Sequence, residues 1–168
     1  MADLKKKGDL AELKVASDLL ARGHRIAIPY GEDSDYDLIC DTGDALHRIQ
    51  VKHVTSDGAV LEVHCSSHSL TNGRILRTKR YTAQTIDWLA AYDCTSDRCF
   101  YVPAVQLGKG RSSINLRLLP AKNGQRAGIN FADDYEAFSS TRATQLEVME
   151  PAGLEPATSG LQSQRSSN

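Results

Sequence analysis

The chain has 168 residues, of which 40% are apolar and 24% are charged, and its formal net charge at pH 7 is −1. This length and composition are typical of one globular domain with a sizeable hydrophobic core. The sequence shows no signal peptide and no apolar run near the length of a membrane span. We therefore expect a soluble cytoplasmic protein and not a membrane protein.

Residues 1–54 predict a helix followed by a short strand and a hairpin. Leucines and alanines recur at helical spacing over residues 3–22 and are followed by Gly23, a typical helix stop. HRIAIPY, residues 24–30, predicts a short strand. YDLICD at 36–41 and LHRIQVKHV at 46–54 predict two antiparallel strands joined by a tight turn.

The remaining 114 positions of the chain are less regular. Residues 66–80 are polar and basic, and no strand or helix is predicted there. Residues 81–93 predict a second helix with Trp88 and Tyr92 as candidate interface aromatics. A tail at 141–168, rich in Pro, Gly and Ser, is expected to be disordered after one domain at 1–140. Further strands are predicted at 58–65, 98–107 and 113–119, and a short helix at 131–138.

The small net charge hides a separation of acidic and basic segments. No acidic residue occurs from Gly108 to Ala132, and RILRTKR at 74–80 is a second basic segment, whereas acids gather at 32–44 and 133–136. This separation suits a phosphate-rich partner that faces a carboxylate site, although a solvated basic loop explains each segment equally well.

The cysteines and histidines give no metal-binding pattern. The four cysteines form no Cys-x2-Cys pair, so we expect reduced, structural thiols. His53, His64 and His68 match no common zinc-ligand spacing and are expected on strand surfaces.

The predicted hairpin brings three polar side chains together. If the tight turn pairs Asp41 with Leu46, the same register places Asp37 opposite Gln50, with Lys52 as a diagonal neighbour of Asp37. The other face of the hairpin is then apolar enough to pack on a helix layer. The alternative is that Gln50 and Lys52 are ordinary polar residues on the solvent face of a half-buried strand.

Glu12 is a fourth polar group in an unexpected position. At 100° per residue, its carboxylate points into the apolar stripe of the first helix. A capping box in which Asp9 is the N-cap would explain this carboxylate without any function. The predicted stripe consists of Val15, Ala16, Leu19 and Leu20.

A helix with Glu12, a strand, and a hairpin carrying Asp37 and then Gln50-x-Lys52 resembles the core of the PD-(D/E)XK nucleases. The matching segments are KKGDLAELKVASDLLARGH, YGEDSDYDLICD, IQVKH and IDWLAAYDCTSDRCFYVP. The chain is most similar to nucleases encoded within group I introns, a branch in which Gln-x-Lys occurs, and more distantly to archaeal Holliday-junction resolvases. The resemblance implies an α/β, restriction-endonuclease-like core with a mixed central sheet flanked by helices.

The same resemblance implies a Mg²⁺-dependent endonuclease that hydrolyses phosphodiester bonds in double-strand DNA, with Mn²⁺ as a substitute ion. The implied catalytic residues are Glu12, Asp37, Gln50 and Lys52, and the metal would be held by Glu12, Asp37 and the Val51 carbonyl. Lys52 would orient or help deprotonate the attacking water and stabilise the phosphate in the transition state. Since Gln50 adds no negative charge, the site should hold its metal less tightly.

Two alternatives to a homing endonuclease stay open. A Holliday-junction resolvase would share the site and differ in substrate, and a catalytically lapsed DNA-binding module is kept open by Gln50.

A long DNA target needs several copies of a small domain, so a homodimer or homotetramer is expected. The residues predicted to contact DNA phosphates are Arg74, Arg77, Lys79, Arg80, Lys109, Arg111 and Arg117.

Overall fold

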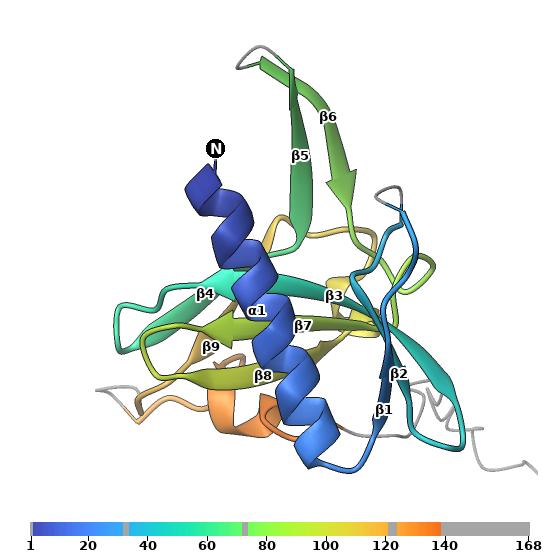
Figure 1. Cartoon of the computed structure of the whole chain (residues 1–168). Helices are drawn as coiled ribbons and strands as arrows, with labels where there is room; N and C mark the ends of the chain where they lie inside the picture. The colour runs from blue at the N-terminus through green and yellow to red at the C-terminus, as the bar shows by residue number, and fades with distance from the viewer. Residues whose placement is uncertain (1, 32–33, 72–73, 121–123, 139–168) are drawn as a thin grey trace, which may run out of the picture.

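The computed structural model describes residues 2–31, 34–71, 74–120 and 124–138 (Figure 1). The predicted tail at 141–168 therefore lies outside the described residues. The α-helix of the described part is α1 (Ala2–Ala21), and the 3-10 helices are η1 (Ala104–Leu107) and η2 (Ala132–Tyr135). The strands are β1 (Arg25–Ala27), β2 (Leu38–Asp41), β3 (Leu46–Val54), β4 (Val60–His64), β5 (Ser66–Thr71), β6 (Arg74–Arg80), β7 (Trp88–Asp93), β8 (Arg98–Pro103), β9 (Ser113–Arg117) and β10 (Asn130–Phe131).

The central sheet has five strands in the order β1-β2-β3-β7-β8. β3 and β7 are parallel and the other pairs are antiparallel, so the sheet is mixed. In the β2–β3 hairpin, Asp41 pairs with Leu46 and Leu38 pairs with Ile49. These pairs confirm the predicted register of this hairpin. The register matters because a slip by one residue would exchange the apolar and polar faces of the hairpin.

Two different layers cover the central sheet. α1 packs on one face, where Ala11, Val15 and Leu19 are fully buried against side chains of β2, β3, β7 and β8. The three-stranded sheet β10-β9-β4 covers the other face through its own apolar side chains, such as Leu61 and Leu116. The predicted α/β class with a mixed central sheet is confirmed, with one helix on one face and a small sheet on the other.

Leu20 does not belong to the buried stripe of α1 as predicted. Its side chain is 56% exposed, whereas Val15 and Leu19 are fully buried. At 100° per residue Leu20 lies about 140° around the helix from Val15, outside the face that meets the sheet.

Among the described residues, no helix combines the length and the apolar character that crossing a membrane requires.

The helix predicted over residues 81–93 is wrong, because this segment contains strand β7. All six residues of β7 are buried. Trp88 and Tyr92 face α1, and Leu89 and Ala91 face the small sheet, so neither aromatic ring forms an exposed interface. A strand that is buried on both faces reads as an unbroken apolar run, which imitates a buried helix.

Residues 66–80, for which no regular element was predicted, form a two-stranded antiparallel sheet of β5 and β6. This hairpin projects away from the two larger sheets (Figure 1). The sequence does contain a hairpin signal, the dipeptide Asn72-Gly73. The long polar flanks of this dipeptide lack the apolar alternation that marks a half-buried strand.

The other predicted elements are found with changed ends. The strand predicted at 98–107 stops at Pro103, where the Ala104 amide donates a hydrogen bond to the Asp87 carbonyl (3.0 Å) and the chain turns into η1. The helix predicted at 131–138 is the short 3-10 helix η2. All four cysteines are free thiols.

Candidate active site

The candidate site lies where β2 begins, beside the middle of β3. The Asp37 amide still donates to the Ile49 carbonyl (2.9 Å), but β2 itself starts one residue later. The N–H and C=O groups of one strand residue point to the same side, so both backbone groups of Val51 face the position where the β2 ladder has ended. There the Asp37 carboxylate takes the place of a strand partner and accepts a hydrogen bond from the Val51 amide (2.8 Å).

The Gln50 side chain completes this arrangement from the buried side. Its NH₂ group donates to the same Asp37 carboxylate oxygen and also to the Val51 carbonyl oxygen (3.2 Å). Gln50 is only 8% exposed. The predicted opposition of Asp37 and Gln50 is therefore a direct contact in the structure.

Lys52 lies two residues further along the same face of β3. Its ammonium donates a hydrogen bond to the Tyr81 hydroxyl (3.2 Å) and lies 4.9 Å from the centre of the Tyr81 ring. Tyr81 is almost fully buried, and its amide donates to the Cys65 carbonyl (3.1 Å). Tyr81 was not among the predicted site residues, because no spacing distinguishes this tyrosine from the other aromatic residues of the chain.

Burial raises the pKa of the Asp37 carboxyl above its ordinary value. The Val51 amide, the positive charge of Lys52 and the Gln50 amide act in the opposite direction and lower the pKa. Asp37 is thus a partly desolvated carboxylate surrounded by groups that favour its charged form. Such a carboxylate is well suited to bind a cation.

Glu12 is in the interior of α1, because the helix begins at Ala2. The capping-box alternative is wrong, since Asp9 lies in the helix interior and cannot be its N-cap. Glu12 follows the buried Ala11, and burial is the main cause that raises the pKa of its carboxyl. The negative charges of Asp37 and then Asp9 raise this pKa further. Glu12 is therefore close enough to Asp37 for the two carboxylates to influence each other's ionisation.

The available donors fit a hard divalent cation. Glu12 and Asp37 offer carboxylate oxygens and Val51 offers a carbonyl oxygen, and Mg²⁺ is usually bound through one or two carboxylates together with substrate phosphates. In the described part of the chain, no cluster of three or more His, Cys, Asp or Glu side chains gathers around one point.

Lys79 connects the projecting hairpin to the candidate site. Its ammonium forms an ion pair with the carboxylate of Asp35, two residues before Asp37. Both side chains are about one third exposed, so the pair lies at the protein surface. The base of the hairpin is thereby held against the segment that leads into Asp37.

A second group of predicted phosphate contacts lies at the same hairpin base. The Arg80 guanidinium donates to the Gly110 carbonyl (3.4 Å), which places β6 against the loop after η1. A Cβ atom at Gly110 would lie 3.0 Å from the Arg80 Cβ, so glycine permits this close approach. Lys109 and Arg111, on either side of Gly110, are exposed.

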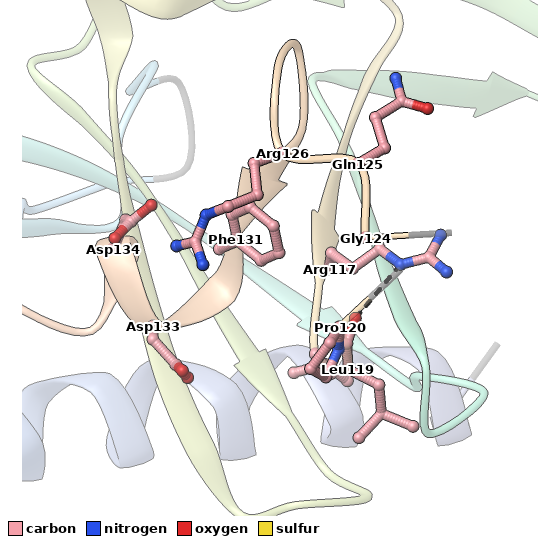
Figure 2. A pocket seen from close by; sticks show the side chains of 10 residues that line it. Arg117, Leu119, Pro120, Gly124, Gln125, Arg126, Phe131, Asp133 and Asp134 are labelled. Carbon is pink, nitrogen blue, oxygen red and sulfur yellow. Dashed lines mark hydrogen bonds between the residues drawn. The ribbon is translucent and has the colours of Figure 1, made fainter. Parts of the chain in front are cut away.

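Of the remaining predicted phosphate contacts, only Arg117 has a described side chain, and it lies away from this site. The side chains of Arg74 and Arg77 lie outside the described part of the structure. Arg117 lines a separate pocket of about 280 Å³, where it donates to the Leu119 carbonyl (3.2 Å) and where Arg126 stacks on Phe131 (Figure 2).

An open cleft of about 850 Å³ adjoins Lys52. His53, His64 and His68, expected on strand surfaces, come from β3, β4 and β5 and all line this cleft. The positions on strands are as predicted, but the convergence of the three strands on one cleft was not predicted. Leu4, near the start of α1, lines it as well.

Comparison with known proteins identifies the family. Residues 2–138 match the family model described as PD-(D/E)XK endonuclease. The chain belongs to this PD-(D/E)XK endonuclease family, which confirms the predicted superfamily.

The fold is similar to the solved structure of a bacterial homing endonuclease, I-Ssp6803I, with a TM-score of 0.61 and 24% sequence identity. The similarity covers 78% of this chain and 86% of that one. It confirms the restriction-endonuclease-like core, and the neighbour is a homing endonuclease, the branch that the sequence resembles. Among curated proteins, none matches the chain.

Replacing Glu12 with glutamine is expected to stabilise the protein in EDTA at neutral pH. The raised pKa of Glu12 means that its ionised form opposes folding above that pKa, and that this cost disappears as the pH falls below the ordinary carboxyl value. Because Glu12 is partly exposed, we expect a gain of only ~0.5 kcal/mol, or about 1–2 °C in Tm.

Thermal unfolding followed by circular dichroism would measure this gain at neutral pH and at about pH 4, where the difference should shrink. If Glu12 is a ligand of the cation, Mg²⁺ should raise the Tm of the wild type more than that of Glu12→Gln. Glu62→Gln, which removes an exposed carboxylate on β4, is the matched control. A loss of stability in Glu12→Gln at neutral pH would contradict the conclusion that the ionised Glu12 carboxylate opposes folding.

Proposed function

We propose that this protein is a Mg²⁺-dependent endonuclease that hydrolyses phosphodiester bonds in double-strand DNA and acts as a group I intron homing endonuclease, with Mn²⁺ able to replace Mg²⁺. The observation that carries this proposal is the Asp37 carboxylate, which accepts a hydrogen bond from the Val51 amide and is influenced by the positive charge of Lys52. Membership of the endonuclease family supports the reaction class.

Each residue of the site has a separate role in this proposal. Glu12, Asp37 and the Val51 carbonyl would hold the cation, which when bound supplies charge neutralisation and a more acidic water molecule. The Lys52 ammonium is held by Tyr81 and acts electrostatically on Asp37, and it would donate to the attacking water or to a phosphate oxygen. Gln50 orients Asp37 through its hydrogen bond.

The DNA would be held by the cleft beside Lys52 and by the projecting hairpin. A two-stranded antiparallel ribbon fits into the major groove, and six to seven residues per strand extend for roughly 20 Å at ~3.3 Å each. Phosphate contacts would come from the basic residues at the hairpin base. These residues are Lys79, Arg80, Lys109 and Arg111.

We further propose that the protein acts as a homodimer or homotetramer. A single domain of this size covers only part of a long target site, and a duplex presents two strands for cleavage. α1 leaves Leu10, Leu13 and Leu20 exposed on its surface, and these are candidates for contacts between copies. Multi-angle light scattering of the full chain would give the number of copies.

Cleavage by the purified full chain tests the proposed activity. The substrates are a linear duplex that carries the uninterrupted intron-insertion sequence and a four-way junction, each with Mg²⁺ and with EDTA. We expect cutting of the linear duplex with Mg²⁺ and no cutting with EDTA. Cutting of the junction alone would identify a resolvase, and binding without cutting of either substrate would identify a DNA-binding module without catalysis.

A further inference from the structure

The Gln50 amide group contacts two of the three groups that would hold the cation. An NH₂ group has two hydrogens, and here one is donated to Asp37 Oδ2 and the other to the Val51 carbonyl oxygen. A Mg²⁺ ion bound by the same two oxygens would lie about 2.0–2.1 Å from each. The amide nitrogen and the cation therefore compete for the same space.

The orientation of this amide is fixed by its surroundings. If the group turned by half a rotation, the Gln50 carbonyl oxygen would face the Asp37 carboxylate and the Val51 carbonyl, which are both acceptors. Gln50 is buried, so water cannot relieve such a contact. With a cation bound to these two oxygens, both acceptors are occupied and the cation repels the hydrogens of the NH₂ group, so this group can no longer stay in place.

We propose that Gln50 is a gate for the cation site: its NH₂ group holds Asp37 and Val51 together in the cation-free protein, and cation binding requires this amide to turn away. The gate rests on the proposed function, because it assumes that Asp37 and Val51 bind a cation. A carboxylate at this position could not act in this way, since it has no hydrogen to donate to Asp37.

A variant without the side-chain amide distinguishes the hypothesis that Gln50 is a gate from the hypothesis that it is only a ligand of the cation. If Gln50 were only a ligand, Gln50→Met would bind Mg²⁺ more weakly than the wild type. If Gln50 is a gate, Gln50→Met removes a competitor of similar volume, and we expect Mg²⁺ affinity in the absence of DNA to be equal or up to about tenfold higher. Isothermal titration calorimetry measures this, with Gln84→Met at an exposed position as the matched control. Weaker binding by about threefold or more would overturn the gate.

Nuclear magnetic resonance of the wild type gives a test that needs no variant to fold. With EDTA, the Gln50 side-chain NH₂ should exchange slowly with solvent, because both hydrogens are bonded and buried. With Mg²⁺ we expect its resonances to shift and its protection to be lost. The Val51 backbone amide, which donates to Asp37, reports cation binding independently.

The two resonances distinguish failure of the gate from failure of the proposed function. If Mg²⁺ shifts the Val51 amide while the Gln50 NH₂ stays protected, the cation site stands and the gate is overturned. If millimolar Mg²⁺ shifts neither resonance, there is no cation site at Asp37, and the gate and the proposed function are overturned together.

Discussion

Replacing Asp37 with asparagine is expected to abolish Mg²⁺-dependent cleavage, with kcat/KM reduced by roughly 10³-fold or more. Asp37 is the carboxylate on which the site is built: the Val51 amide, the Gln50 amide and the Lys52 charge all act on it. Asparagine keeps the volume and an oxygen that can accept from Val51, so the fold should persist. It removes the negative charge that would bind the cation, and DNA binding should change by no more than about threefold.

Single-turnover cleavage of a labelled duplex measures the loss, and a gel-shift assay without Mg²⁺ measures binding. Asp44→Asn is the matched control, because Asp44 is an exposed carboxylate at the turn of the same hairpin. This variant should cleave the duplex at the wild-type rate. If Asp37→Asn kept more than about a tenth of the wild-type rate, the carboxylate would not be the central cation ligand.

The part of the site that lies on one hairpin could be predicted from the sequence. A tight turn fixes the pairing of two strands, and strict alternation of side chains then decides which residues share a face. Asp37, Gln50 and Lys52 followed from this rule without knowledge of any other element. The structure adds that Asp37 lies just before the paired part of β2, where its carboxylate can reach the Val51 backbone.

The rest of the fold depends on contacts between distant segments. β7 carries apolar side chains toward both faces, so the sequence period that separates a strand from a helix is absent in it. Tyr81 becomes part of the site because the chain returns to β3 after the β5–β6 hairpin. A polar hairpin without apolar alternation gives no periodic signal in the sequence, so pattern alone does not reveal it.

The atomic arrangement at Gln50 could not be predicted either. The resemblance and the hairpin register predicted that Gln50 belongs to the site and lies opposite Asp37. They did not predict which end of the Gln50 amide faces Asp37. This choice follows from the acceptors around it, and one of them is a backbone carbonyl that any residue at position 51 would provide. Backbone groups are invisible to an interpretation based on side-chain patterns.

Replacing Lys52 with methionine is expected to leave DNA binding almost unchanged and to lower cleavage by about 10²- to 10³-fold. Methionine keeps an unbranched chain that can pack on the Tyr81 ring, so the local structure should be retained. The ammonium is lost, and with it the donor for the attacking water or the phosphate. A gel-shift assay and single-turnover cleavage separate the two effects, and equal losses in both would assign Lys52 to DNA binding instead.

The pH dependence of Mg²⁺ binding distinguishes a catalytic Lys52 from a merely structural one. The Lys52 charge lowers the pKa of Asp37, so in Lys52→Met that pKa rises and a higher pH is needed to ionise the carboxylate. The midpoint of Mg²⁺ binding against pH should therefore move upward in Lys52→Met. In Lys52→Arg it should stay near the wild-type position, because the charge is kept, although the bulkier guanidinium cannot reproduce the ammonium geometry at Tyr81 and cleavage should remain impaired. An unchanged midpoint in Lys52→Met would show that the charge does not act on Asp37, and Lys52 would then have no electrostatic role in the cation site.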